Sequence, residues 1–324
     1  MPEPLITINN VSRKFGIRKG LRVIEFYALK NIDLEIPRAT IVGIVGESGS
    51  GKTTLGKITL AILKPSSGKV LYAGQDLFKF VKKRENRRLL QYIPQDPYAS
   101  LNPFKTVKQL LMEPVKYHRL AESDREAIEI VEKMLINVGL TPPERYLDLF
   151  PPQLSGGERQ RVSIARALIV NPSYVVADEP VTMLDASLKS GIISTLRDLM
   201  IKSNISLTFI THEISLLQFF GPETSVVIMY LGKIMEQGPL KVLLSEPLHP
   251  YTKALIQAIP VPDPKLRATR SLILKEASPP SPINRPPGCP LSDRCPYVME
   301  ICTKEEPSLK EQSISHKVAC HLYG

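Results

Sequence analysis

The segment Gly-Glu-Ser-Gly-Ser-Gly-Lys-Thr-Thr at positions 46–54 constrains the fold of this chain more than any other feature. It matches the pattern G-x-x-x-x-G-K-[ST], in which glycines let successive backbone N–H groups turn inward and surround phosphate oxygens. The apolar residues 41–45 precede it and predict a strand, and residues 53–63 predict a helix. Strand, tight loop and helix are the context that this motif requires, so we predict a phosphate-binding loop rather than an ordinary Gly/Ser turn.

The residues of this loop have separate predicted roles. We expect the Lys52 ammonium to reach the β- and γ-phosphates of a nucleotide and the Thr53 hydroxyl to bind Mg²⁺. The other expected nucleotide-binding residues are Gly46, Glu47, Ser48, Gly49, Ser50, Gly51 and Thr54. A helix that begins at the end of the loop adds its positive N-terminus to this anion site.

Five further segments complete a recognisable pattern of sequence motifs. In chain order they are Gln95 in Tyr-Ile-Pro-Gln-Asp-Pro, the run Leu154-Ser155-Gly156-Gly157-Glu158, the carboxylates Asp178 and Glu179 after an apolar strand, Asp185 in Met-Leu-Asp, and His212 in Ile-Thr-His-Glu. These segments resemble the Q-loop, signature motif, Walker B motif, D-loop and switch histidine of ATP-binding-cassette (ABC) proteins. Residues 5–235 therefore resemble an ABC nucleotide-binding domain, and the resemblance implies that the chain hydrolyses ATP.

The resemblance also implies the catalytic roles. Asp178 is expected to hold Mg²⁺, with Thr53 and Gln95 as the other metal contacts, and Glu179 to polarise the attacking water. His212 is expected to sense the γ-phosphate, and Gln95 to report its presence. In this family the signature residues face the nucleotide of a second domain. The corresponding residues here are Ser155, Gly156, Gly157 and Glu158, together with Asp185. Because the chain holds one cassette, its partner must be another chain, and the pair would close over two ATP molecules and open after hydrolysis.

The alternation of helical and apolar segments predicts an α/β fold of the P-loop NTPase type. We expect an ABC nucleotide-binding domain over residues 1–238, with a mostly parallel sheet, an antiparallel β subdomain from the runs 5–8, 22–26, 32–36 and 41–45, and a helical subdomain at about 96–160. The spacing Ser123-x-x-Glu126 predicts a capping box there, and Ser155-x-x-Glu158 has the same spacing. Residues 239–324 form a Pro-rich, loop-rich C-terminal extension.

Phe15 lies where ABC proteins place an aromatic ring that stacks on adenine. Simple core packing of Phe15 is an alternative, and Tyr27 is a weaker candidate for the same role. The net charge of +10 is partly concentrated in residues 79–88. A solvated helix face would account for these charges, and contact with anionic lipid headgroups or with a partner is the sharper alternative. No nucleic-acid reader module accompanies the charge, so we do not expect a nucleic-acid partner.

Four cysteines in the extension, Cys289, Cys295, Cys302 and Cys320, follow the spacing C-x5-C-x6-C-x17-C. Zinc sites usually contain a short C-x2-4-C pair, which is missing here. The long irregular spacing, with proline after two of the cysteines, favours thiolate ligands of a [4Fe–4S] cluster. Zinc and four unrelated free thiols are the alternatives.

The extension is similar to that of ATP-binding subunits of dipeptide/oligopeptide ABC importers, as are the segment 95–103, the run Pro-Pro-Gln-Leu-Ser at 151–155 and the run 249–255. The resemblance implies as partners a second, non-identical ATPase subunit, two transmembrane permease subunits and, indirectly, an extracytoplasmic substrate-binding protein. It implies a peripheral position at the cytoplasmic face of the cell membrane, since no apolar run approaches 18 residues. The cargo would be peptides or, in some archaea, sugar oligomers. The alternatives are a soluble ABC ATPase in DNA repair or translation, and an iron–sulfur regulatory module with a vestigial cassette.

Overall fold

The computed structural model describes residues 4–20, 22–259, 274–275 and 280–324. The chain divides into two compact units that are each built from separate stretches of sequence. The first comprises Met1–Ile6, Ile36–Ile41 and Tyr72–Ile210, and the second comprises Thr7–Glu35, Val42–Leu71 and Thr211–Gly324. Among the described residues, no helix combines the length and apolar character needed to cross a bilayer.

The first unit contains three parallel strands in the order β6-β7-β8, which span Leu90–Ile93, Tyr174–Asp178 and Ser206–Thr211. Every residue of β7 and β8 is buried, as expected for parallel strands that are covered on both faces. The register pairs Ile93 with Ala177 and Asp178 with Ile210. The carboxyl ends of these strands therefore meet at one edge, where the Walker B residues emerge.

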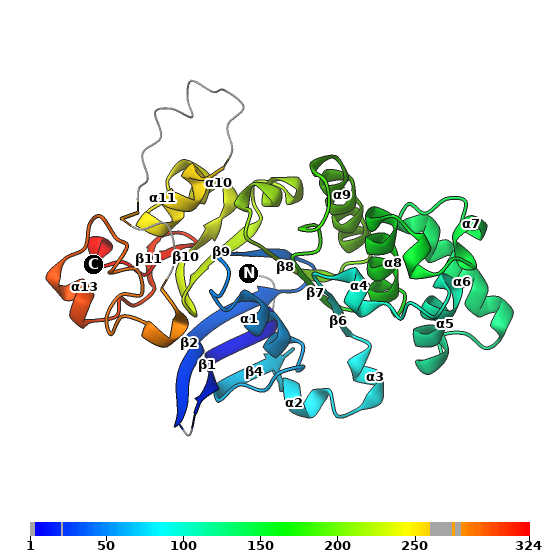
Figure 1. Cartoon of the computed structure of the whole chain (residues 1–324), viewed down its shortest axis with the longest axis horizontal. Helices are drawn as coiled ribbons and strands as arrows, with labels where there is room; N and C mark the ends of the chain where they lie inside the picture. Colours follow the sequence, from blue (N-terminus) through cyan, green and yellow to red (C-terminus); the bar gives the residue numbers. More distant parts are fainter. Residues whose placement is uncertain (1–3, 21, 260–273, 276–279) are drawn as a thin grey trace. The chain divides into compact units, whose positions relative to one another are not determined.

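Helices make up most of the rest of the first unit. They are α2 (Leu77–Phe80), α3 (Arg84–Arg87), α4 (Pro97–Ser100), α5 (Val107–Tyr117), α6 (Asp124–Asn137), α7 (Glu144–Leu147), α8 (Gly156–Leu168) and α9 (Ala186–Lys202), and a short strand β5 spans Gln75–Asp76. Helices α5, α6 and α8 pack on one another (Figure 1). The basic segment 79–88 falls on α2 and α3, and α3 buries none of its residues.

The two predicted capping boxes differ in outcome. The box at Ser155 is confirmed, because its hydroxyl accepts the Glu158 N–H and the Glu158 carboxylate accepts the Ser155 N–H. At α6 only half of the box is present. Ser123 caps the helix by accepting the Glu126 N–H, but the Glu126 carboxylate accepts the N–H of Glu122 instead of that of Ser123.

The second unit contains two sets of strands. Strands β1 (Pro4–Lys19), β2 (Arg22–Pro37) and β4 (Ser67–Tyr72) lie in the order β2-β1-β4, so the runs that we predicted as separate short strands belong to long ones. The other set has the order β11-β12-β10-β9-β3, from Lys310–Ser313, His316–Val318, Lys233–Pro239, Ser225–Tyr230 and Ile41–Val45. Strand β3 pairs with β9 in parallel, so our assignment of the run 41–45 to the antiparallel β subdomain was wrong. The remaining pairs of this set are antiparallel.

The C-terminal extension is more regular than its prolines suggested. Helices α10 (Leu240–Ser245), α11 (Pro250–Gln257) and α13 (Glu300–Lys304) alternate with loops and 3₁₀ turns, and β12 pairs with β10, whose last residue is Pro239. Four prolines of this Pro-rich extension, Pro260, Pro262, Pro264 and Pro279, lie outside the described residues. The described part of the extension is thus a folded element of the second unit.

Candidate functional site

The phosphate-binding loop lies between β3 and helix α1 (Lys52–Thr59), in the predicted order of strand, loop and helix. Gly49 and Gly51 have φ of 79° and 99°, values that glycine adopts at little cost. Gly46 is required for a different reason. A Cβ added there would lie 2.1 Å from the carbonyl oxygen of Met229, so only glycine lets the loop approach β9 this closely.

Polar groups converge on the inside of this loop. The Lys52 ammonium, on a side chain that is almost fully buried, donates to the carbonyl oxygens of Gly46 (2.7 Å) and Glu47 (2.9 Å). The Ser50 hydroxyl is buried, and within the described residues it has no hydrogen-bond partner. A buried cation and a buried hydroxyl in a glycine-rich loop at a helix N-terminus suit the phosphate groups of a nucleotide.

The carboxylates of the Walker B motif lie at the end of β7. Glu179 has φ 46°, an uncommon value for a residue other than glycine, and its N–H donates to the Ile210 carbonyl (2.9 Å). Its carboxylate accepts hydrogen bonds from the Gln95 side-chain amide (3.2 Å) and from the Thr182 hydroxyl (3.1 Å). The structure therefore brings Gln95 and Glu179 together, as a shared role in ordering water requires.

Tyr92 is a residue of this edge to which sequence reasoning assigned no role. Its hydroxyl donates to the Asp178 carboxylate over 2.7 Å, and Asp178 is only 3% exposed. Burial, followed by the neighbouring Asp178 charge, raises the pKa of Tyr92 well above its usual value, so the phenol keeps its proton at neutral pH. A tyrosine three residues before Gln95, on the strand beside β7, is the signal that could have identified it.

The signature residues lie at the N-terminus of α8. Ser155, its N-cap, also donates its hydroxyl proton to the Glu158 carboxylate (2.8 Å), and these hydrogen bonds, that of the Ser155 backbone first, lower the pKa of Glu158. Neither Gly156 nor Gly157 has a positive φ. A Cβ added at either position would meet its nearest neighbour at 3.4 to 3.5 Å, an ordinary contact. Packing within the chain therefore does not explain these two glycines.

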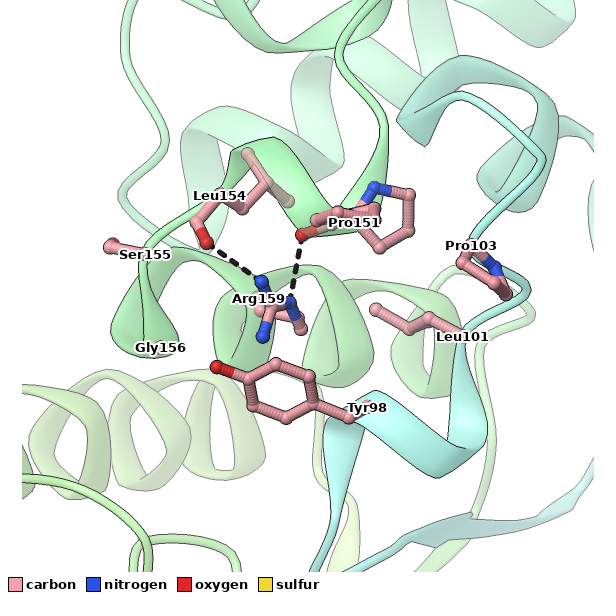
Figure 2. A pocket seen from close by; sticks show the side chains of 9 residues that line it. Tyr98, Leu101, Pro103, Pro151, Leu154, Ser155, Gly156 and Arg159 are labelled. Atoms are coloured by element: carbon pink, nitrogen blue, oxygen red, sulfur yellow. Dashed lines mark hydrogen bonds between the residues drawn. The ribbon is translucent and has the colours of Figure 1, made fainter.

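A cavity of about 400 Å³ adjoins the signature helix (Figure 2). It is lined by Tyr98, Leu101, Pro103, Pro151, Pro152, Leu154, Ser155, Gly156 and Arg159. The Arg159 guanidinium stacks on the Tyr98 ring, 3.5 Å from its centroid, and donates to the carbonyl oxygens of Pro151 and Leu154. This contact links the segment after Gln95 to the helix that carries the signature motif.

The remaining predicted site residues take different positions. His212 directly follows β8 and belongs to the second unit. Its side chain is 43% exposed, and its Nε2 lies 3.8 Å from the Glu213 carboxylate. Asp185 is exposed at the N-terminus of α9. Phe15 is half-buried on β1, between the Phe26 ring (6.1 Å between centroids) and the Arg13 guanidinium (4.8 Å). Both contacts fit either of the roles that the sequence left open for Phe15.

None of the four cysteines forms a disulfide bond, and three of them are buried. Burial first, and then the neighbouring thiols of Cys302, Cys320 and Cys295, raise the pKa of Cys289 to about 12, so the four cysteines lie near one another. The Cys289 N–H donates to the Cys302 carbonyl (2.8 Å). Across the described ranges, however, no group of three or more His, Cys, Asp or Glu side chains is arranged to hold a metal ion. The predicted cluster therefore has no support in the ligand geometry.

The phosphate loop, the Walker B strand and the capped signature helix together define an ABC-type ATPase. Comparison with known sequences agrees with this class. The family described as ABC transporter matches residues 29–182, and the family described as oligopeptide/dipeptide transporter, C-terminal region, matches residues 235–302. The second match falls on the end of β10 and the extension, as the sequence resemblance predicted.

Similar proteins cover nearly the whole chain. The putative oligopeptide transport ATP-binding protein YkfD of Bacillus subtilis is 39% identical over 99% of this chain and 96% of its own length. The oligopeptide transport ATP-binding protein AppF of the same organism is 38% identical over 99% and 98%. The protein OppF of Haemophilus influenzae, with the same description, is 37% identical over 98% and 97%.

Solved structures agree at the level of the cassette. The dimeric bacterial ABC transporter cassette MJ0796 is 30% identical, with a TM-score of 0.63, and the match covers 72% of this chain and 98% of that chain. A structure of the same cassette in a post-hydrolysis state with ADP and phosphate matches equally well. The chain therefore belongs to the ABC transporter ATP-binding proteins, in the group that carries the oligopeptide/dipeptide transporter C-terminal region.

Proposed function

We propose that this chain is the ATP-hydrolysing subunit of an importer for oligopeptides or dipeptides. The observation that carries the proposal is the match of residues 235–302 to the oligopeptide/dipeptide C-terminal region, in addition to the cassette. The relatives named above are described as oligopeptide transport ATP-binding proteins and align over at least 96% of their length. A soluble ABC ATPase of DNA repair or translation has no comparable support. Residues 1–238 would form the nucleotide-binding domain and residues 239–324 the extension.

In the proposed site, the backbone N–H groups of residues 46–54 and the Lys52 ammonium would hold the phosphates of ATP. Thr53, Gln95 and Asp178 would hold Mg²⁺, which neutralises charge on the phosphate oxygens. Glu179 would accept the proton of the attacking water, and its hydrogen bond from Gln95 would orient it. His212 would contact the γ-phosphate.

The signature residues would act on the nucleotide of a second ATPase subunit. The glycines support this, because the chain's own packing leaves room for a side chain at Gly156 and Gly157, whereas a closely approaching phosphate would not. Ser155, Glu158 and Asp185 would lie at the same interface. ATP would then favour the closed pair, and hydrolysis would favour the open one.

The remaining partners would be two permease subunits in the membrane and, through them, an extracytoplasmic binding protein. The chain would lie peripherally at the cytoplasmic face. The cavity beside Tyr98 and Arg159 supports a permease contact, since it joins the segment after Gln95 to the signature helix. Affinity purification from solubilised membranes should recover two membrane proteins and a second ATPase. Recovery of the chain with ribosomes or DNA instead would contradict the importer.

We also propose that the four cysteines bind a [4Fe–4S] cluster, which would hold the extension together. Three of the four cysteines are buried, and the neighbouring thiols raise the pKa of Cys289; both observations support this proposal. Anaerobic purification followed by iron, sulfide and zinc analysis tests it. About four irons per chain, lost in Cys302→Ser, would support the cluster. Stoichiometric zinc, or no metal with four titratable thiols, would contradict it.

The catalytic assignment is tested by Glu179→Gln. This variant should bind ATP with nearly the wild-type Kd, hydrolyse it at least about a hundredfold more slowly, and accumulate as the closed pair. Glu144→Gln, at the exposed start of α7, is the matched control and should hydrolyse ATP normally. Hydrolysis by Glu179→Gln at the wild-type rate would exclude Glu179 as the group that activates water.

A further inference from the structure

Arg294 is a buried charged residue that has no role in the ATP site described above. It belongs to the C-terminal extension, in the turn between Cys289 and Cys295, and only 2% of its side chain is exposed. Its guanidinium donates two hydrogen bonds to the Glu47 carboxylate, from Nη1 to Oε2 (2.8 Å) and from Nη2 to Oε1 (3.1 Å). Glu47 is the second residue of the phosphate-binding loop, so the extension reaches the nucleotide site directly.

The other groups of Glu47 are also held. Its N–H donates to the hydroxyl of Tyr251, on helix α11 of the extension, over 2.8 Å. Its carbonyl oxygen accepts from the Lys52 ammonium (2.9 Å) and from the Ser50 N–H (3.2 Å). Two of the three polar groups of this residue are thus bound by the extension, and the third is bound by the residues that face the phosphates.

A carboxylate in a phosphate-binding loop presents an electrostatic problem. The triphosphate of ATP is strongly negative, and an uncompensated Glu47 side chain would repel it. The paired guanidinium cancels this charge with a bidentate geometry that a lysine could not reproduce. The Tyr230 hydroxyl accepts a further hydrogen bond from Arg294 Nη1 over 3.2 Å and helps to hold the guanidinium in place.

The backbone around Arg294 is anchored within the extension. The N–H groups of Arg294 and Cys295 both donate to the Leu291 carbonyl (2.9 Å each), and the Arg294 carbonyl accepts the Lys275 N–H (3.0 Å). We propose that Arg294 is a positioning residue of the ATP site, through which the folded extension neutralises Glu47 and keeps the phosphate loop in its binding conformation. The inference rests on the ATP-binding function of the cassette.

Four variants of the full chain test the proposal: Arg294→Met, Arg294→Lys, Glu47→Gln and the double variant Glu47→Gln/Arg294→Met. The measurements are the Kd for a fluorescent ATP analogue, KM and kcat for ATP, and the melting temperature. Arg294→Met should raise Kd and KM about tenfold, because it leaves the Glu47 carboxylate unpaired, with a smaller effect on kcat. Arg294→Lys, which keeps the charge, should raise them about threefold.

The double variant provides the readout that a merely structural role would not change. Removing the Glu47 charge should restore the Kd of the Arg294→Met background to within about threefold of wild type. Val318→Ala is the matched control, since it removes buried packing from strand β12 of the extension and has no bond to the loop. It should lower the melting temperature and leave Kd unchanged.

The outcomes separate this proposal from the proposed function. If Arg294→Met binds ATP like the wild type, or if Glu47→Gln does not restore its affinity, Arg294 has no positioning role. The same conclusion holds if Val318→Ala raises Kd as much as Arg294→Met does, because loss of stability would then explain both. If Arg294→Met does not fold, Arg294→Lys and the double variant decide in the same way. Failure of the wild-type chain to bind ATP would instead contradict the cassette assignment.

Discussion

His249 makes the stability of the extension depend on pH in a range that is easy to reach. The residue caps helix α11, and its Nδ1 accepts the N–H of Tyr251 over 3.0 Å. It is fully buried, and burial, followed by the positive charge of Lys253, lowers the pKa of His249 to about 3. The backbone N–H of His249 donates to the buried Glu236 carboxylate. A protonated imidazole would lose the Nδ1 lone pair and with it the cap of the helix.

The magnitude follows from the difference in proton binding between the folded and unfolded states. An unfolded histidine has a pKa near 6.5, so between about pH 6.5 and pH 3 the unfolded chain binds a proton that the folded chain excludes. The stabilisation is fully present above pH 6.5 and is lost as the pH falls toward 3. The loss is about 1.4 kcal/mol for each pH unit below 6.5, and so about 1.4 kcal/mol between pH 7.5 and pH 5.5.

Urea unfolding of the wild type and of His249→Asn at pH 7.5, 6.5 and 5.5 measures this term. Asparagine accepts a hydrogen bond at an N-cap and does not titrate, so the variant keeps the cap and loses only the proton linkage. The difference in the free energy of unfolding between the two proteins should change by about 1.4 kcal/mol in favour of the variant at pH 5.5. All other titrating groups cancel in this difference. A difference that is constant over the three pH values would show that burial of His249 does not lower its pKa in the folded state.

Three further predictions concern the two units separately. Lys52→Ala removes the buried ammonium of the phosphate loop and should raise the Kd for Mg-ATP about a hundredfold in a fluorescence titration; an unchanged Kd would contradict the phosphate-loop assignment. Tyr92→Phe removes the hydrogen bond to Asp178 and should lower kcat about tenfold at saturating Mg-ATP while Kd changes little; an equal loss in both would indicate a binding role. Leu135→Ala, in the fully buried face of α6, should destabilise the chain by about 2 to 5 kcal/mol in urea unfolding without changing KM; a loss below 1 kcal/mol would mean that the helix packs loosely.

Local chemistry allowed much of the fold to be predicted. The glycine-rich loop between β3 and α1 was expected because its backbone angles and its close approach to β9 demand glycine at set positions. The N-termini of α6 and α8 were expected because Ser123 and Ser155 cap their own helices within one turn. Strand β7 was expected because the residues before Asp178 are apolar, as in a parallel strand that is buried on both faces.

Element lengths were harder to predict, since they depend on neighbours. Strands β1 and β2 each extend over 16 residues, although their sequences contain only short apolar runs, because pairing in the sheet satisfies the backbone of the polar residues as well. Helix α1 ends at Thr59 rather than near residue 63. In its last turn the Thr59 hydroxyl donates to the Gly56 carbonyl oxygen. Such hydrogen bonds leave little trace in the periodicity of apolar residues.

The class of this protein could be inferred from the sequence alone, because the cassette motifs are short, local and chemically specific. The sequence also indicated Gln95, Glu179 and the signature residues, whose proposed roles rest on their motifs. Only the tertiary structure revealed that Tyr92 orients Asp178 and that Arg294 pairs with Glu47. The physical reason is distance along the chain: 86 residues separate the first pair and 247 the second, so no local pattern records either contact. Folding brings these groups together, and burial then makes their pairing necessary.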